Sequence, residues 1–258
     1  MSITDFSMNW FDLSGKSAIV TGGNSGLGQG FARALAAAGA NVFVPSLADD
    51  DGTTRQLIEA TGQQFAFLET DITRAGEPAR VVESCVEAFG TVDILVNSAG
   101  ICPLGEVLDF GRDKWDATVA VNLTAAFEMS HEAAKVMVPQ RSGKIINICS
   151  MFSFLGGRLS PAYAATKHGI AGLTKAYCDE LAMHNIQVNG IAPGYFATAI
   201  TENTRSNPET NQRVLDHIPA ERWGERVDLM GTAVFLASTA SDYVNGHVLA
   251  VDGGYLVR

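Results

Sequence analysis

Short runs of apolar residues alternate with longer amphipathic segments along the whole chain. Several of the runs are continuous Val/Ile stretches, which are typical of parallel strands buried on both faces. We therefore predict strands at Ser17–Gly22, Asn41–Val44, Phe65–Glu69, Val92–Asn97, Gly143–Ser150, Ile186–Ile191 and His247–Val251. The segments between them predict helices at Gly26–Ala38, Asp51–Thr61, Glu77–Phe89, Arg112–Met137, Pro161–Met183 and Arg226–Ala237.

This alternation predicts an α/β protein with a Rossmann-type three-layer sandwich, in which helices cover both faces of a doubly wound, seven-stranded parallel sheet. No linker, repeat or low-complexity tract interrupts residues 1–258, so we interpret them as one domain. The rhythm breaks at about residues 194–220, a long polar stretch bounded by prolines. An insertion after the C-terminal end of a strand is where a lid or substrate loop would lie. The alternative is a surface excursion without a role.

Composition narrows the class of protein. The chain of 258 residues is 47% hydrophobic and 18% charged, which suits a globular protein with a large core. A net charge of −10 argues against a nucleic-acid partner. No apolar stretch approaches the roughly 20 residues that cross a bilayer. We therefore expect no membrane association.

The N-terminus and the cysteines indicate the compartment. The Met1–Ser7 segment lacks the basic start and apolar run of a secretory signal. The four cysteines show no Cys-x-x-Cys spacing, so we expect reduced thiols, a cytoplasmic protein and no metal site. We interpret Cys102 and Cys149, which lie beside candidate motifs, as packing residues.

A glycine-rich turn follows the first predicted strand. The sequence Gly22-Gly-Asn-Ser-Gly26-Leu-Gly28 leads directly into a predicted helix. Glycines allow a tight turn and close approach of the backbone to a pyrophosphate, and the helix N-terminus offers free N–H groups. The context predicts a dinucleotide site, and the alternative is a glycine turn without a ligand.

Tyr163 and Lys167 are the candidate chemical groups. In a helix, residues four apart share one face, with Cβ atoms about 5–6 Å apart. Moving a tyrosine pKa from about 10 to about 7 needs roughly 4 kcal/mol, and a charge about 4 Å away at an effective dielectric of about 20 supplies that much. We therefore expect Lys167 to do most of the lowering of the Tyr163 pKa, with an oxidised nicotinamide adding to it. Ser150 lies thirteen residues upstream, and Ser153 is its rival.

Together these motifs resemble the short-chain dehydrogenase/reductase family over nearly the whole chain. The matching segments are Thr21–Gly28, Asp71–Ile72, Asn97–Gly100, Val121–Asn122, Ser150 with Tyr163 and Lys167, and Pro193–Gly194 with Thr198. Ser98 departs from the family, which usually has asparagine there. Further segments, Gly143–Ile148 and Ile218–Gly224 among them, resemble the sugar-acid members, the group of 2-deoxy-D-gluconate 3-dehydrogenase and 2-dehydro-3-deoxy-D-gluconate 5-dehydrogenase.

The resemblance implies an NAD(P)-dependent oxidoreductase that transfers a hydride between nicotinamide and a secondary alcohol or ketone. Tyr163 would be the general acid/base, Lys167 would lower its pKa, Ser150 would bind the substrate oxygen, and Asn122 would order a water that relays protons. The family also implies a homotetramer or homodimer, joined through the two long helices and the C-terminal region. The implied cofactor contacts are Gly22, Asn24, Ser25, Gly26, Leu27, Gly28, Ser46, Asp71, Ile72, Asn97, Ala99, Gly100, Tyr163, Lys167, Pro193, Gly194, Phe196 and Thr198.

Cofactor choice depends on the end of the second strand. Ser46 stands where an aspartate would favour NAD, and neither arginine nor lysine stands beside it. Asp49, Asp50 and Asp51 would repel a 2′-phosphate if they point inward; the alternative is a solvated acidic turn. We expect NAD as the cofactor, with NADP as the open alternative.

The expected substrate is a sugar acid. Candidate contacts are Ser150, Tyr195 and the arginines Arg158, Arg205 and Arg213, because a guanidinium pairs with a carboxylate through two hydrogen bonds. Each arginine is alternatively a surface residue. Two other functions stay open: the same chemistry on a polyol or other small alcohol, and a non-catalytic nucleotide-binding regulator.

Overall fold

The computed structural model describes residues 5–258, in which seven parallel strands form one sheet in the order β3-β2-β1-β4-β5-β6-β7. The segment Met1–Ser7, in which we expect no secretory signal, begins outside the described residues. Nothing among the described helices combines the length and apolar character that spanning a membrane requires. The strands are β1 (Ser17–Val20), β2 (Asn41–Ser46), β3 (Phe65–Glu69), β4 (Ile94–Asn97), β5 (Gly143–Ile148), β6 (Ile186–Pro193) and β7 (Val248–Val251).

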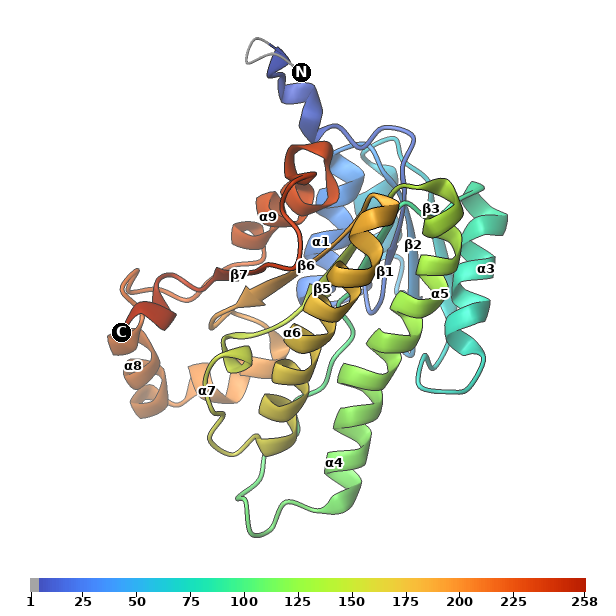
Figure 1. Cartoon of the computed structure of the whole chain (residues 1–258). Coiled ribbons are helices and arrows are strands. Elements are labelled where there is room, and N and C mark those ends of the chain that lie inside the picture. Colours follow the sequence, from blue (N-terminus) through green and yellow to red (C-terminus); the bar gives the residue numbers. More distant parts are fainter. Residues whose placement is uncertain (1–4) are drawn as a thin grey trace.

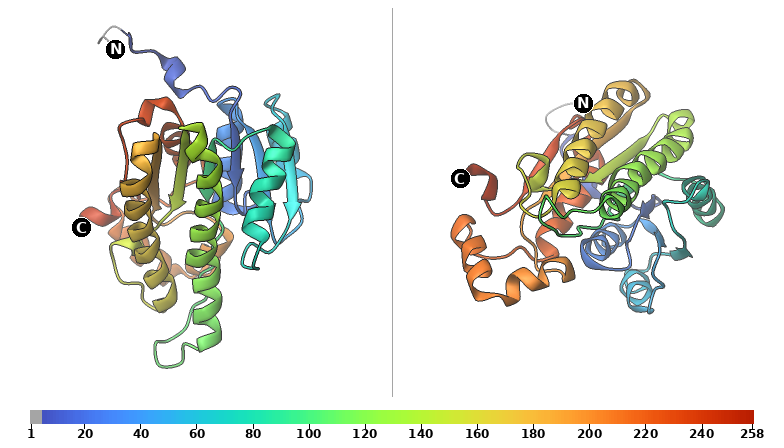
Figure 2. Two further views of the ribbon diagram at one scale, coloured as in Figure 1. Left: turned by 45° about the vertical axis from the view of Figure 1, so that its right-hand side comes forward. Right: turned by 90° about the horizontal axis from the view of Figure 1, so that it is seen from below.

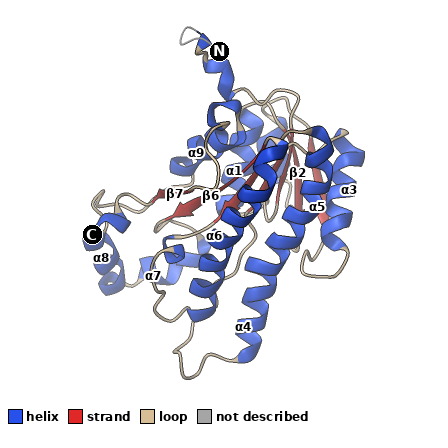
Figure 3. Cartoon of the chain, in the orientation of Figure 1, coloured by secondary structure: helices blue, strands red, loops and turns tan. Residues whose placement is uncertain are grey.

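Helices cover both faces of this sheet, which confirms the predicted three-layer fold (Figures 1 and 3). One face carries α1 and α9, and the other carries α3, α5 and α6 (Figure 2). The α-helices are α1 (Gly26–Ala37), α2 (Thr53–Glu59), α3 (Glu77–Phe89), α4 (Arg112–Val119), α5 (Ala125–Gln140), α6 (Pro161–Leu181), α7 (Glu202–Ser206), α8 (Pro208–His217) and α9 (Val227–Ala237).

Successive side chains of a strand pack into two separate hydrophobic cores, one on each face of the sheet. Ala18 and Val20 of β1 belong to the cluster that contains α1 and α9 residues, whereas Ile19 belongs to the cluster with α3 and α5 residues. Side chains of a strand alternate between faces, so a sheet covered on both sides needs apolar residues at every position. This explains the continuous Val/Ile runs of the sequence.

The strand order reverses between β1 and β4, which lie side by side although β2 and β3 come between them in the chain. In an open parallel sheet, ligands bind at the carboxyl ends of the strands beside such a reversal. The glycine turn after β1 and the segments after β4, β5 and β6 therefore meet at one edge.

Most predicted element boundaries differ from the structure by a few residues, and two of the differences have a clear physical cause. The helix predicted over Arg112–Met137 is split by a π-helical turn at Ala120–Thr124, between α4 and α5. Turns of this kind insert one extra residue, and nothing in the apolar periodicity marks them. Strand β2 continues past Val44 to Ser46, because Pro45 and Ser46 pair with Leu68 and Glu69 of β3. Pro45 has no N–H to donate, but its carbonyl accepts the N–H of Gly22.

The predicted insertion contains α7 and α8, and its two ends meet in a neck. The N–H of Ala197 donates to the carbonyl of Gly224, whose own N–H donates to the carbonyl of Tyr195, both at 2.9 Å. The insertion lies at the same edge of the sheet as the loop between β5 and α6 (Figure 1).

Candidate active site

The glycine turn has the shape of a cradle. A Cβ at Gly28 would overlap the carbonyl oxygen of Gly22 and lie 3.0 Å from its carbonyl carbon. Gly22 and Gly26 have φ of +63° and +53°, which glycine adopts without strain. Ser25 caps α1 without a side-chain hydrogen bond, and the space beside Gly26 is open. The N–H groups of the first three helix residues, Gly26, Leu27 and Gly28, are therefore left for a ligand. This cradle fits a dinucleotide pyrophosphate.

Asn24 ties this cradle to the segment after β2. Its side-chain amide donates to the carbonyls of Ala48 at 2.7 Å and Asp49 at 3.2 Å. Ser46, at the end of β2, is only partly buried. The carboxylates of Asp50 and Asp51 accept amides in the first turn of α2, so these two aspartates cap a helix. The structure therefore favours the alternative in which Asp50 and Asp51 belong to an acidic surface turn, over the one in which they point inward and repel a 2′-phosphate.

A threonine whose individual role the sequence does not reveal connects β1 to the loop after β4. The Thr21 hydroxyl accepts the N–H groups of Ser98 and Ala99, both at 3.0 Å. Because Ser98 is held through its backbone, its departure from asparagine leaves this connection intact. The position of Thr21 directly before the glycines is the one signal of its role.

Below this loop lies a buried polar network. The Asn97 amide donates to Ser130 at 2.9 Å and to the Asn147 side chain at 2.8 Å, and Asn147 in turn donates to Thr174. Asn97 is 6% exposed, so its position depends on these bonds. The network joins β4 and β5 to α5 and α6 and fixes the base of the candidate site.

The π-helical turn presents Asn122 to the loop after β4. Its side chain accepts the N–H of Ile101 at 2.8 Å and donates to the carbonyl of Ile101 at 2.9 Å. A longer bond of 3.3 Å reaches Thr166 of α6. A Cβ at Gly100 would lie 3.4 Å from the Asn122 oxygen, so the two residues pack closely. Asn122 therefore joins the loop after β4 to the helix that carries Tyr163 and Lys167.

The structure brings Ser150, Tyr163 and Lys167 together at the carboxyl end of β5. The Ser150 and Tyr163 hydroxyls share a hydrogen bond. The Lys167 ammonium lies 5.4 Å from the centre of the Tyr163 ring and donates to the carbonyl of Ile148 at 2.5 Å. Ser153 accepts the N–H of Ser150 and donates to the carbonyl of Lys167 at 2.7 Å. The rival serine is thus occupied in holding the other residues.

The acid–base properties of this group differ from the prediction. Burial raises the pKa of Tyr163, and the charge of a neighbouring Cys102 thiolate would raise it further, whereas the hydrogen bond from Ser150 lowers it. Burial also lowers the pKa of Lys167 to about 8. The expectation that Lys167 does most of the lowering, with an oxidised nicotinamide adding to it, is not met in the protein by itself, because desolvation is the largest influence on the Tyr163 phenol and raises its pKa.

The cysteines beside this group are poor nucleophiles. Burial raises the pKa of both Cys102 and Cys149 to about 11. A thiol with so high a pKa carries little thiolate near neutral pH. This supports the interpretation of both cysteines as packing residues.

The segment after β3 contributes Asp71 and Ile72. The Asp71 carboxylate accepts the N–H and hydroxyl of Thr73, which lowers the pKa of the carboxyl. Ile72 is 9% exposed and packs in the core, so it fixes this turn. Both residues lie at the β3 end of the shared edge.

The segment after β6 crosses the same edge. Pro193 ends the strand, and a Cβ at Gly194 would lie 2.7 Å from the Cα of Asp252. The Phe196 ring is buried against Gly224, so its side chain serves the core. Thr198 begins a short helical turn, with its N–H bound to Thr201 at 3.1 Å. Sequence reasoning missed Asp252, although the run Asp-Gly-Gly marks a turn there.

The candidate substrate residues differ in their partners. Arg205 pairs with Glu202 and donates to the carbonyl of Thr198, and Arg213 pairs with Glu209. Arg158 is exposed, and within residues 5–258 its side chain has neither an ion pair nor a hydrogen bond. Tyr195 turns its ring toward Trp223 and Tyr255.

Comparison with known proteins identifies the family. A family model described as enoyl-(acyl carrier protein) reductase, of the short-chain dehydrogenase type, matches residues 22–256. The chain belongs to the short-chain dehydrogenase/reductase family, whose members are oxidoreductases acting on CH–OH groups.

Individual relatives are close. The chain is 68% identical to the uncharacterized oxidoreductase YgcW of Escherichia coli (strain K12), with 100% of this chain and 98% of that protein covered. It is 48% identical to a 2-dehydro-3-deoxy-D-gluconate 5-dehydrogenase of Bacillus subtilis (strain 168), over 96% and 97% of the two chains. A crystal structure of a gluconate 5-dehydrogenase from Burkholderia cenocepacia J2315, in complex with NADP and tartrate, superposes with a TM-score of 0.93 at 36% identity, covering 97% and 98%.

Proposed function

We propose that this protein transfers a hydride between a nicotinamide dinucleotide and a secondary alcohol or ketone of a gluconate-like sugar acid. The arrangement of Ser150, Tyr163 and Lys167 at the carboxyl edge of the sheet is the observation that carries the proposal. The names of the relatives, several of them gluconate or deoxygluconate dehydrogenases, support the substrate class.

Each residue of the group has a distinct task. Tyr163 exchanges a proton with the substrate oxygen as general acid/base. Ser150 donates a hydrogen bond to that oxygen, and this bond strengthens as negative charge develops there. Lys167 holds a positive charge beside the Tyr163 ring. Asn122, fixed to the backbone of Ile101, orients α6 against the loop after β4.

The nicotinamide dinucleotide supplies the hydride acceptor or donor, and we assign its pyrophosphate to the Gly22–Gly28 cradle. Oxidised nicotinamide also carries a positive charge. Since burial raises the pKa of Tyr163, a positive charge brought beside the phenol favours its ionised form. We therefore propose that Tyr163 works as a base only when the dinucleotide is bound.

The cofactor is NAD or NADP, and the choice between them is a matter of binding energy near Ser46. The side chain of Ser46 is neutral, and the carboxylates of Asp50 and Asp51 are turned to amides in the first turn of α2. We propose NAD as the first cofactor to test and NADP, which the B. cenocepacia relative holds, in parallel.

We propose that Arg158 binds the substrate carboxylate. It lies in the loop between Ser150 and Tyr163, and of the three candidate arginines it has no partner among the described residues. In Arg158→Ala the KM for sugar acids should rise by at least about tenfold, and the KM for neutral polyols should stay the same. Arg213→Ala is the matched control, because Arg213 pairs with Glu209 on α8.

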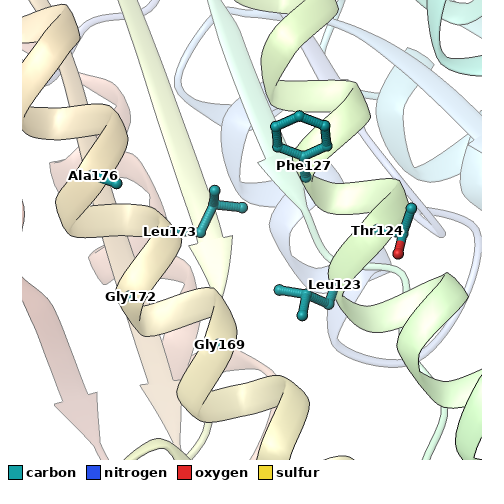
Figure 4. A pocket seen from close by; sticks show the side chains of 7 residues that line it. All are labelled: Leu123, Thr124, Phe127, Gly169, Gly172, Leu173 and Ala176. Atoms are coloured by element: carbon teal, nitrogen blue, oxygen red, sulfur yellow. The ribbon is translucent and has the colours of Figure 1, made fainter.

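An apolar groove between α5 and α6 supports a dimer through these helices. Leu123, Thr124, Phe127, Gly169, Gly172, Leu173 and Ala176 line a cavity of about 360 Å³ (Figure 4). The glycines let a second helix approach closely. We propose a homodimer or homotetramer joined there, which sedimentation at micromolar concentration tests.

The four cysteines are unpaired, in keeping with a cytoplasmic location.

The deciding experiment measures reduction of NAD and of NADP across sugar acids, polyols and simple secondary alcohols. Turnover of sugar acids supports the proposal, and turnover of neutral alcohols alone contradicts the substrate class. Cofactor binding without turnover of any compound would favour the alternative of a non-catalytic regulator.

A further inference from the structure

A cluster of aromatic rings joins the insertion to the C-terminal segment. The Tyr195 ring lies 5.4 Å from the rings of both Trp223 and Tyr255, and the Tyr195 and Tyr255 hydroxyls share a hydrogen bond. Tyr255 also lies 4.2 Å from the ring of His217, the last residue of α8. The Trp223 indole donates to Asn211 of α8 at 2.8 Å. The cluster thus connects both ends of the insertion to the chain terminus.

The chain after β7 is shaped to reach this cluster. Gly253 and Gly254 have φ of +65° and +90°, which turn the backbone toward α8. The Asp252 carboxylate accepts the N–H groups of Gly254 at 2.8 Å and Leu256 at 2.9 Å, so the turn that carries Tyr255 is fixed from below.

Residues 252–258 contact the insertion at further points. The N–H of Ala220 donates to the carbonyl of Gly253 at 3.0 Å, and a Cβ on Gly254 would lie 2.9 Å from the Pro219 ring. The terminal Arg258 donates to the carbonyl of Asp216 in α8, beside which the C-terminus lies in Figure 1.

The same segment reaches the candidate site on its other side, because Asp252 packs directly against Gly194 in the loop after β6. One short stretch of chain therefore contacts both the loop that crosses the site edge and the far end of the insertion. The neck at Tyr195 and Gly224 fixes the insertion at its base. The contacts of Tyr255 with His217 and of Arg258 with Asp216 attach it a second time, at α8.

We propose that residues 252–258 latch the α7–α8 insertion over the substrate site, with Tyr255 as the positioning residue. The proposal rests on the proposed function for its kinetic consequence. If the insertion binds substrate only in the latched arrangement, the apparent affinity for substrate decreases in proportion as the fraction of latched molecules decreases. Weakening the latch therefore raises the KM of the substrate more than it lowers kcat.

The kinetic experiment compares three variants of the full chain. We expect Tyr255→Ala to raise the substrate KM about tenfold and Tyr255→Phe, which loses only the hydroxyl, to raise it about threefold. The Kd of the reduced dinucleotide should stay the same. Tyr243→Ala is the matched control, because the Tyr243 side chain is fully exposed, and its KM should equal that of the wild type.

A second measurement needs no substrate. We expect amides of α8 to exchange hydrogen faster, and trypsin to cut after Arg205 and Arg213 faster, in both Tyr255 variants than in Tyr243→Ala. Wild-type exchange in both Tyr255 variants would overturn the latch. Faster exchange with an unchanged KM would show that the segment fastens the insertion without positioning it for substrate, and would overturn the proposal as well.

This pair of measurements separates the latch from the proposed function. If the wild-type protein turns over no sugar acid, the proposed function fails. Hydrogen exchange of the α8 amides in the Tyr255 variants still tests whether residues 252–258 hold the insertion. If Tyr255→Ala does not fold, Tyr255→Phe keeps the ring packing and gives the decision.

Discussion

The buried ammonium of Lys167 makes the stability of the folded protein depend on pH. Its side chain is 5% exposed, and burial lowers its pKa from 10.5 to about 8. Below pH 8 the lysine is protonated in both the folded and the unfolded state, so the cost of burying the charge is fully present. Between pH 8 and pH 10.5 the unfolded chain binds more protons than the folded one, and stability therefore rises with pH.

We expect Lys167→Met to remove this rise. One pKa unit corresponds to about 1.4 kcal/mol, so the lysine makes wild type more stable at about pH 10 than at about pH 6 by roughly 3 kcal/mol. Methionine has a similar length and no titrating group. The free energy of unfolding of the variant minus that of wild type should therefore fall by roughly 3 kcal/mol across this range.

Urea unfolding of the cofactor-free proteins at several pH values measures this difference. Groups that titrate in both proteins and do not interact with Lys167 cancel, such as Cys85, whose pKa burial raises to about 12. Lys175→Met is the matched control, since Lys175 lies on the exposed side of the same helix. A difference that stays constant from about pH 6 to about pH 10 would refute the reasoning, because it would mean that Lys167 keeps its proton in the fold.

Three further variants test the site. Tyr163→Phe should abolish turnover and leave the cofactor Kd unchanged; steady-state kinetics and a fluorescence titration check both, and full activity would contradict the assignment. Gly28→Val should raise the cofactor Kd at least about tenfold, because its side chain overlaps the Gly22 carbonyl, while circular dichroism shows a retained fold. Ser46→Asp should raise the Kd of NADPH more than that of NADH, because a carboxylate repels the 2′-phosphate; an unchanged ratio would place the phosphate elsewhere.

Local patterns were sufficient to predict the strands, the glycine cradle and the proximity of Tyr163 to Lys167. Apolar runs, glycine positions and the four-residue helical spacing are properties of neighbouring residues. The pKa of Tyr163 was not predictable in this way, because it depends on burial by segments distant in sequence. The same holds for the π-helical turn at Asn122, whose side chain bonds the backbone of Ile101 in another loop.

Orientation of polar side chains was the second limit. The sequence places Asp49, Asp50 and Asp51 near Ser46 and leaves their direction open. The structure turns Asp50 and Asp51 to the amides of α2, because a helix N-terminus offers unpaired donors at that point. The aromatic cluster at Tyr255 joins residues 195 and 255, which no local period connects.

The hydrogen-bonded neck between Tyr195 and Gly224 has a consequence for how such proteins diversify. It closes residues 197–223 into a ring that leaves and re-enters the fold at one point. The entropy of closing a loop grows only logarithmically, by about 0.6 kcal/mol for each doubling of length. Residues can therefore be gained or lost within the ring without moving β6 or β7. Substrate range can change through the length of one segment while the edge that holds Tyr163 stays the same.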